Sequence, residues 1–84
     1  MSNRYKGFYD TKIEVDSPRK IVIEILKVDP DISYYRIANE IYIHPSNINY
    51  YLNGNTKSIN LTTAQNLYDK FGIIYKSHKK NLIM

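Results

Sequence analysis

Proline and glycine divide residues 17–73 of this chain into four short segments, and each segment carries apolar residues at helical spacing. All three prolines and two of the three glycines stand at the predicted ends of these segments: Pro18, Pro30, Pro45, Gly54 and Gly72. Proline suits the first turn of a helix or the chain just beyond its end, whereas glycine suits the residue after the last turn. The chain is therefore expected to form several short helices.

The first two helices have recognisable starts. Ser17-Pro18 begins the first helix, because the serine hydroxyl can cap backbone N–H groups, and Asp29-Pro30 ends it. Its predicted buried face consists of Ile21, Val22, Ile25, Leu26 and Val28. The second helix is predicted to begin after Ser33 as its cap, and its inward residues are Ile37, Ala38 and Ile41.

A very short turn connects the second helix to the third. Tyr42-Ile43 forms this turn, His44-Pro45 opens the third helix, and Asn53-Gly54 ends it with a left-handed conformation at Gly54. Residues at spacings of three and four would face the core: Ile48, Tyr51 and Leu52. Two short helices joined by so short a turn have the arrangement of a helix-turn-helix motif.

A fourth helix is predicted from Leu61 to Phe71, capped by Asn60 or Thr62 and ended by Gly72. Its expected inner face is Leu61, Ala64, Leu67, Tyr68 and Phe71. Residues 11–16 alternate polar and β-branched side chains, which predicts a short strand, and residues 73–75 are the best candidate to pair with it. The tail could be a strand, a short helix or a contact between two copies of the chain.

Length and composition favour one small globular domain over residues 1–84, with its core in residues 17–73, an N-terminal arm or strand in 1–16 and a tail in 74–84. Of the 84 residues, 43% are apolar and none is cysteine, so the core must come from aliphatic and aromatic side chains. No apolar run reaches the roughly 18 residues that span a bilayer, and the N-terminus lacks the apolar stretch of a signal peptide. A cytoplasmic location is expected.

Three stretches in order, residues 32–41, 46–54 and 61–73, resemble the Cro/repressor-type helix-turn-helix family of phage and plasmid regulators, also described as lambda-repressor-like or XRE-type. Ile37-Ala38 is similar to the family's Leu-Ala pair, and Leu52-Asn53-Gly54 is similar to its usual end of the recognition helix. Further matches follow at Thr63, Leu67, Phe71, Gly72 and Ile73. The resemblance implies a mainly α fold, a bundle of four to five helices, with the small β element of the chain ends beside it.

The chain departs from the family pattern at two positions of the motif. Tyr42 stands where the family usually has glycine, and a left-handed tyrosine would be strained, so we expect the turn to differ locally. Pro45 occupies a position that often carries a base-reading polar side chain. The recognition helix also lacks long basic or glutamine side chains.

The resemblance implies a function, sequence-specific binding of double-stranded DNA by a small transcriptional regulator. It implies base contacts from His44, Ser46, Asn47, Asn49 and Tyr50. Outward spacing on the third helix agrees for Ser46, Asn47, Asn49 and Tyr50, although His44 could equally be an exposed helix cap. Phosphate contacts are expected from Ser33, Tyr34, Arg36 and Lys57.

Charge is compatible with this partner. The net charge is +4, and no carboxylate lies between Glu40 and Asp69, so phosphates could approach this stretch without repulsion. His44 and His78 are too few and too far apart for a metal site, and no nucleophile–base spacing or glycine-rich phosphate loop is present. We therefore expect no enzyme activity, no cofactor and no metal. The alternative function is a protein-interaction module on the same fold, which the fold alone cannot distinguish.

A homodimer on DNA is expected, because one recognition helix of small polar residues offers few strong contacts and a second copy raises the affinity. The contact would come from the chain ends, which have apolar residues to spare: Phe8, Ile13, Val15, Ile74, Tyr75, Leu82, Ile83 and Met84. The alternative is that the two ends pair with each other and close the core of a monomer.

Overall fold

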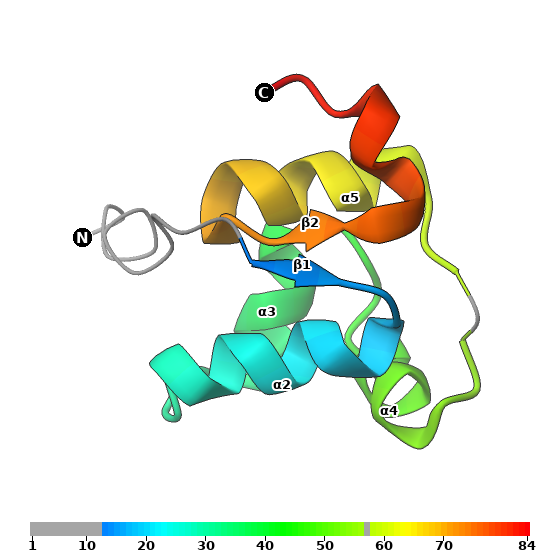
Figure 1. The fold of residues 1–84 in the computed structure, drawn as a ribbon. Coiled ribbons are helices and arrows are strands. Elements are labelled where there is room, and N and C mark those ends of the chain that lie inside the picture. The colour runs from blue at the N-terminus through cyan, green and yellow to red at the C-terminus, as the bar shows by residue number, and fades with distance from the viewer. Residues whose placement is uncertain (1–12, 57) are drawn as a thin grey trace.

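The computed structural model describes residues 13–56 and 58–84, and this part of the chain is a small helical bundle with one two-stranded sheet (Figure 1). The elements in chain order are β1 (Glu14–Val15), α2 (Pro18–Val28), α3 (Tyr34–Glu40), α4 (Ser46–Asn53), α5 (Leu61–Asn66), the π-helical turn η1 (Leu67–Phe71), β2 (Ile74–Tyr75) and the 3-10 helix η2 (Lys76–Asn81). The prediction of a mainly α fold with a small β element from the chain ends is confirmed.

Polar caps begin three of the helices where the sequence predicted them. The Ser17 hydroxyl accepts a hydrogen bond from the Lys20 amide at 3.4 Å, and the Ser33 hydroxyl accepts one from the Arg36 amide at 3.0 Å. Of the two candidate caps of α5, Asn60 is the one used, since its side-chain oxygen accepts from the Thr63 amide at 2.8 Å. Each bond satisfies an N–H group that the helix itself leaves unpaired.

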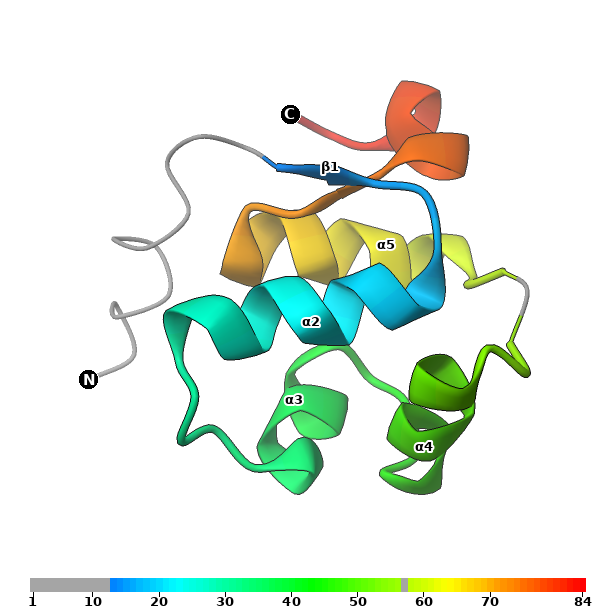
Figure 2. The same cartoon turned by 60° about the horizontal axis from the view of Figure 1, so that its bottom comes forward.

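The core lies between α2, the helix pair α3–α4 and the α5–η1 helix (Figure 2). Most of the predicted inward residues are buried in it: Ile21, Val22, Ile25, Ile37, Ala38, Ile41, Ile48, Tyr51, Ala64, Leu67 and Phe71. Three other predicted core residues, Leu26, Val28 and Leu52, are only partly buried and pack against its edge. One apolar stripe per short helix is thus enough to build this core.

The predicted inner face of α5 is wrong at Leu61, which is 43% exposed. The buried residues of α5 and η1 are Thr63, Ala64, Leu67 and Phe71. At 3.6 residues per turn, Leu61 lies about 100° from the centre of that face, while Tyr68 lies nearer to it and is half-buried. The threonine is therefore the inward residue of the first turn, and the leucine points to solvent.

The two chain ends meet in a parallel pair of strands. Glu14 is opposite Ile74 and Val15 is opposite Tyr75 in the register of β1 and β2, so the expected partner of the N-terminal strand, residues 73–75, is the one observed. The Ile74 amide also donates to the Ile13 carbonyl at 2.8 Å, and the Lys79 ammonium pairs with the Glu14 carboxylate. The pairing closes one side of the core, because Val15, Ile74 and Tyr75 are all buried.

Candidate nucleic-acid interface

The turn between α3 and α4 is built around a left-handed tyrosine. Tyr42 has a φ of 62° and is the one non-glycine residue with positive φ in the described chain. The Ile43 amide donates back to the Ala38 carbonyl at 3.0 Å, which is the bond that ordinarily closes a helix ending in a left-handed residue. The expectation of a locally different turn is therefore wrong. Tyr42 adopts the conformation that glycine usually supplies.

Two further helices of the chain end in the same way with glycine. The φ of Gly54 is 77°, and the Asn55 amide donates to the Tyr50 carbonyl at 3.0 Å. The φ of Gly72 is 69°, and the Ile73 amide donates to the Leu67 carbonyl at 3.2 Å. The turn after α3 thus keeps the geometry of these two ends with a bulkier residue, and the abrupt change of direction into α4 is preserved.

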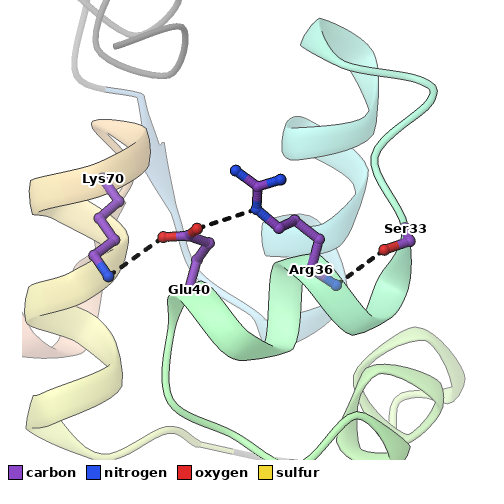
Figure 3. Close-up of polar contacts among 4 residues, drawn as sticks. All are labelled: Ser33, Arg36, Glu40 and Lys70. Carbon is purple, nitrogen blue, oxygen red and sulfur yellow. Dashed lines mark hydrogen bonds and ion pairs between the residues drawn. The ribbon is translucent and has the colours of Figure 1, made fainter. Parts of the chain in front are cut away.

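A network of charged side chains holds this turn against the η1 end of the α5 helix. Figure 3 shows the Glu40 carboxylate between the Arg36 guanidinium and the Lys70 ammonium, at 3.1 Å from Arg36 Nε and 3.3 Å from Lys70 Nζ. Lys70 Nζ also lies 5.1 Å from the centre of the Tyr42 ring, within the range of a cation–π interaction. The only carboxylate of the helix-turn-helix is therefore neutralised by two cations.

The outer face of α4 carries hydrogen-bonding side chains and no charge. Ser46, Asn49 and Tyr50 are exposed and Asn47 is half-buried, while Ile48 and Tyr51 are buried beneath them. Burial, together with a smaller effect of the neighbouring Tyr75, raises the pKa of Tyr51 to about 12. Figure 2 places α3 and α4 together along one edge of the molecule, so this face of α4 is open to solvent.

His44 and Ser46 bond to each other at the start of α4. His44 Nδ1 lies 2.9 Å from Ser46 Oγ and accepts a hydrogen bond from the Ser46 amide at 3.2 Å. An imidazole nitrogen that accepts from an amide carries no proton, so the proton of the neutral ring belongs to Nε2. The Nδ1 edge of His44, one residue before the N-cap Pro45, is thus used by Ser46, and its outer edge offers an N–H donor to a ligand.

Two of the predicted phosphate-contacting residues at the start of α3 already bond to other groups of the protein. The Ser33 hydroxyl caps α3, and the Arg36 guanidinium is paired with Glu40. Tyr34 is 42% exposed. Lys57 lies outside the described residues. Of the three predicted phosphate contacts that the structure describes, Tyr34 is thus the one whose exposed side chain takes no part in the contacts given above.

Sequence reasoning missed two exposed tyrosines that border the predicted site, Tyr35 on α3 and Tyr42 in the turn, which are 66% and 64% exposed. Helical spacing carried the signal for Tyr35, because Ile37, Ala38 and Ile41 occupy the inward positions and leave Tyr35 outside. For Tyr42 the signal was weaker, since a bulky residue at a predicted left-handed position gives no direction for its side chain.

A hydrogen bond between His78 and Ile59 holds the loop after α4 at the end that precedes α5. His78 Nε2 lies 2.6 Å from the Ile59 carbonyl oxygen, which ties η2 to the loop just before α5, and Ile59 itself is buried. The described residues contain no group of three or more side chains that could hold a metal ion. None of their helices has the length and apolar character to cross a membrane.

Comparisons of this chain with protein-family models, with curated proteins and with solved structures found no match.

Proposed function

We propose that this protein binds double-stranded DNA through α3, the Tyr42 turn and α4, and acts as a small sequence-specific transcriptional regulator. In this arrangement α4 enters the major groove, and α3 crosses the phosphate backbone and sets the register. The observation that carries the proposal is the open outer face of α4, which presents amides and hydroxyls, while the carboxylate of α3 is neutralised by Arg36 and Lys70.

The side chains on α4 suit base edges in a definite way. An asparagine amide can donate to and accept from adenine at the same time, and Asn49 is exposed on this face. The Tyr50 and Ser46 hydroxyls suit either bases or phosphates. We assign base contact to His44, Ser46, Asn47 and Asn49, contact with either a base or a phosphate to Tyr50, and phosphate contact to Ser33, Tyr34, Arg36 and Lys57.

Asn49→Ala tests the base contact. After a preferred site has been selected from a random duplex library, the variant should bind that site more weakly by about 1–3 kcal/mol and bind random duplex as the unaltered protein does. Lys57→Ala should instead weaken binding to all duplexes alike and flatten the salt dependence by about one unit. Ser46→Ala is a less clean test, because Ser46 also bonds to His44. An Asn49→Ala variant with unchanged affinity for the selected site would remove Asn49 from the interface.

A second candidate function is favoured by the same surface, because exposed tyrosines with little net charge are also typical of protein-binding sites. In that case a helix-turn-helix fold would bind another protein. Duplex DNA at low salt separates the two functions, since a protein-binding module has no reason to retain it.

A further inference from the structure

The exposed tyrosines of the described chain all belong to the helix-turn-helix. They are Tyr34 and Tyr35 on α3, Tyr42 in the turn and Tyr50 on α4, with exposed fractions from 42% to 66%. We call these four residues the tyrosine surface. The other described tyrosines, Tyr51, Tyr68 and Tyr75, are buried or half-buried. Aromatic side chains of this size are thus placed outward selectively, on the two helices that the proposed function assigns to DNA.

The same segment is almost without usable cationic charge. Residues 33–56 are all described and contain one arginine, Arg36, and one glutamate, Glu40, which form an ion pair at 3.1 Å. Lys70, which reaches this region from η1, is bound to the same carboxylate. A phosphate that drew on Arg36 or Lys70 would have to compete with Glu40 for them. The surface therefore differs from a DNA-binding surface that relies on unpaired lysine and arginine.

We propose that the tyrosine surface holds the DNA backbone by neutral hydrogen bonds, with the hydroxyls of Tyr34, Tyr35 and Tyr50 donating to phosphate oxygens. This inference rests on the proposed function. Tyrosine hydroxyls, serine hydroxyls and amides at helix N-termini are all established kinds of phosphate donor. A neutral donor releases no counterion when it binds, because counterion release follows the number of phosphates neutralised by cations. The consequence is an affinity that depends only weakly on salt.

Hydrogen bonds to phosphates fix the position of the protein on the duplex but do not distinguish one base sequence from another. Tyr34 and Tyr35 are the first two residues of α3, the helix that would cross the backbone, whereas Tyr50 lies on the outer face of α4. Removing one of these hydroxyls should therefore weaken binding to preferred and random duplex by the same factor. A base-reading residue would instead lose affinity for the preferred site alone.

The experiment measures the affinity of the full chain for a duplex at several sodium chloride concentrations, together with Tyr35→Phe and Tyr50→Phe. We expect log affinity to fall with log salt with a slope no steeper than about −2. Each variant should bind preferred and random duplex about three- to tenfold more weakly, the loss of one neutral hydrogen bond, with an unchanged slope. Lys80→Gln is the control, because Lys80 is an exposed residue of η2 and this helix lies away from α4 in both views. The variant should leave affinity and slope unchanged.

Two results would overturn the inference while leaving DNA binding intact. One is a slope steeper than about −2, which would mean that several cations contact phosphates. The other is unchanged affinity in both phenylalanine variants. Absence of duplex binding at about 50 mM salt would contradict the proposed function itself, together with this inference, and would direct the search to a protein that binds the tyrosine surface.

Discussion

At the scale of single residues, Tyr42 combines a strained backbone with a useful side chain. A left-handed conformation costs a residue with a Cβ atom about 1–2 kcal/mol, and glycine avoids this cost. The Tyr42 ring recovers part of it through Lys70, since an exposed cation–π contact is worth about 0.5–1 kcal/mol. These two effects are close in size, so the protein can keep a tyrosine where glycine would be the usual choice.

The two effects can be separated by two substitutions at this position. Tyr42→Ala keeps the strain and loses the ring, whereas Tyr42→Gly loses both. We expect Tyr42→Gly to be more stable than Tyr42→Ala by about 1 kcal/mol in urea unfolding, because only alanine keeps the strained Cβ. An alanine variant as stable as the glycine variant would show that the backbone at Tyr42 carries no strain.

Ile48 is the central residue under the proposed DNA-contacting face and is fully buried. Ile48→Asn should unfold the domain, because it loses the packing of a buried side chain and adds about 1–3 kcal/mol for an unpaired amide. That is a large fraction of the stability of so small a protein. Thermal unfolding followed by circular dichroism checks this, with Leu61→Asn as control because Leu61 is 43% exposed. A folded Ile48→Asn variant with an unchanged melting temperature would contradict the helix phase of α4.

At the scale of elements, the helices could be predicted because their signals are local. Caps at Ser17 and Ser33, the Asp29-Pro30 stop and the glycine after α4 each act within a few residues. The inward residues of α5 were harder to predict. Leu61 was assigned inward because it continues the apolar spacing of Ala64, Leu67 and Phe71, but in the structure Thr63 takes the inward position of the first turn. A π-helical turn at Leu67–Phe71 follows and departs from regular α-helical spacing.

In the candidate site, too, the features set by local sequence could be predicted and those set by packing could not. The outward positions of Ser46, Asn49 and Tyr50 follow from helical periodicity, so the sequence was sufficient for them. The Arg36–Glu40–Lys70 network was not predictable, because Lys70 is 30 residues from Glu40 and meets it only after η1 has packed against α3. Contacts between distant segments depend on packing, for which local patterns carry no signal.

The contribution of Tyr51 on α4 to folding stability depends on pH. Burial raises the pKa of Tyr51 from its usual 10 to about 12, so the folded protein prefers the neutral phenol. This contribution to stability is fully present below pH 10 and is lost as the pH rises through about 12. Tyr51→Phe should therefore reduce the fall of the urea midpoint between these pH values. Tyr35→Phe, at an exposed position, should leave that fall unchanged, and equal falls in the two variants would contradict the assignment.

At the scale of the whole molecule, the single chain itself buries four of the eight apolar residues on which the homodimer expectation rested, and another of them, Phe8, lies outside the described residues. Val15, Ile74, Tyr75 and Leu82 are buried within one chain, while Ile83 and Met84 remain 82% and 63% exposed. The Gln65 side chain holds this exposed end in place, since Ile83 N donates to its oxygen at 2.8 Å and its nitrogen donates to the Ile83 carbonyl at 3.2 Å. The homodimer stays a prediction. Among the described residues, the apolar side chains left exposed for its contact are chiefly Ile83 and Met84.

We expect light scattering at micromolar concentration to give the mass of two chains. Ile83→Ser combined with Met84→Ser should shift the mass to that of one chain without unfolding, because both side chains are exposed in the single copy. On DNA, a dimer should protect two half-sites about one helical turn apart, roughly 34 Å. A single-chain mass for the unaltered protein, with protection of one asymmetric half-site, would contradict the prediction.

The proposed DNA-binding surface consists of α3, the Tyr42 turn and α4. Its most direct test is a titration of the isotopically labelled protein with a duplex, followed by the shifts of its backbone amide signals. We expect the largest shifts within residues 33–56 and small changes in η2. Shifts concentrated on the lysines of η2, or no shifts at low salt, would contradict this expectation.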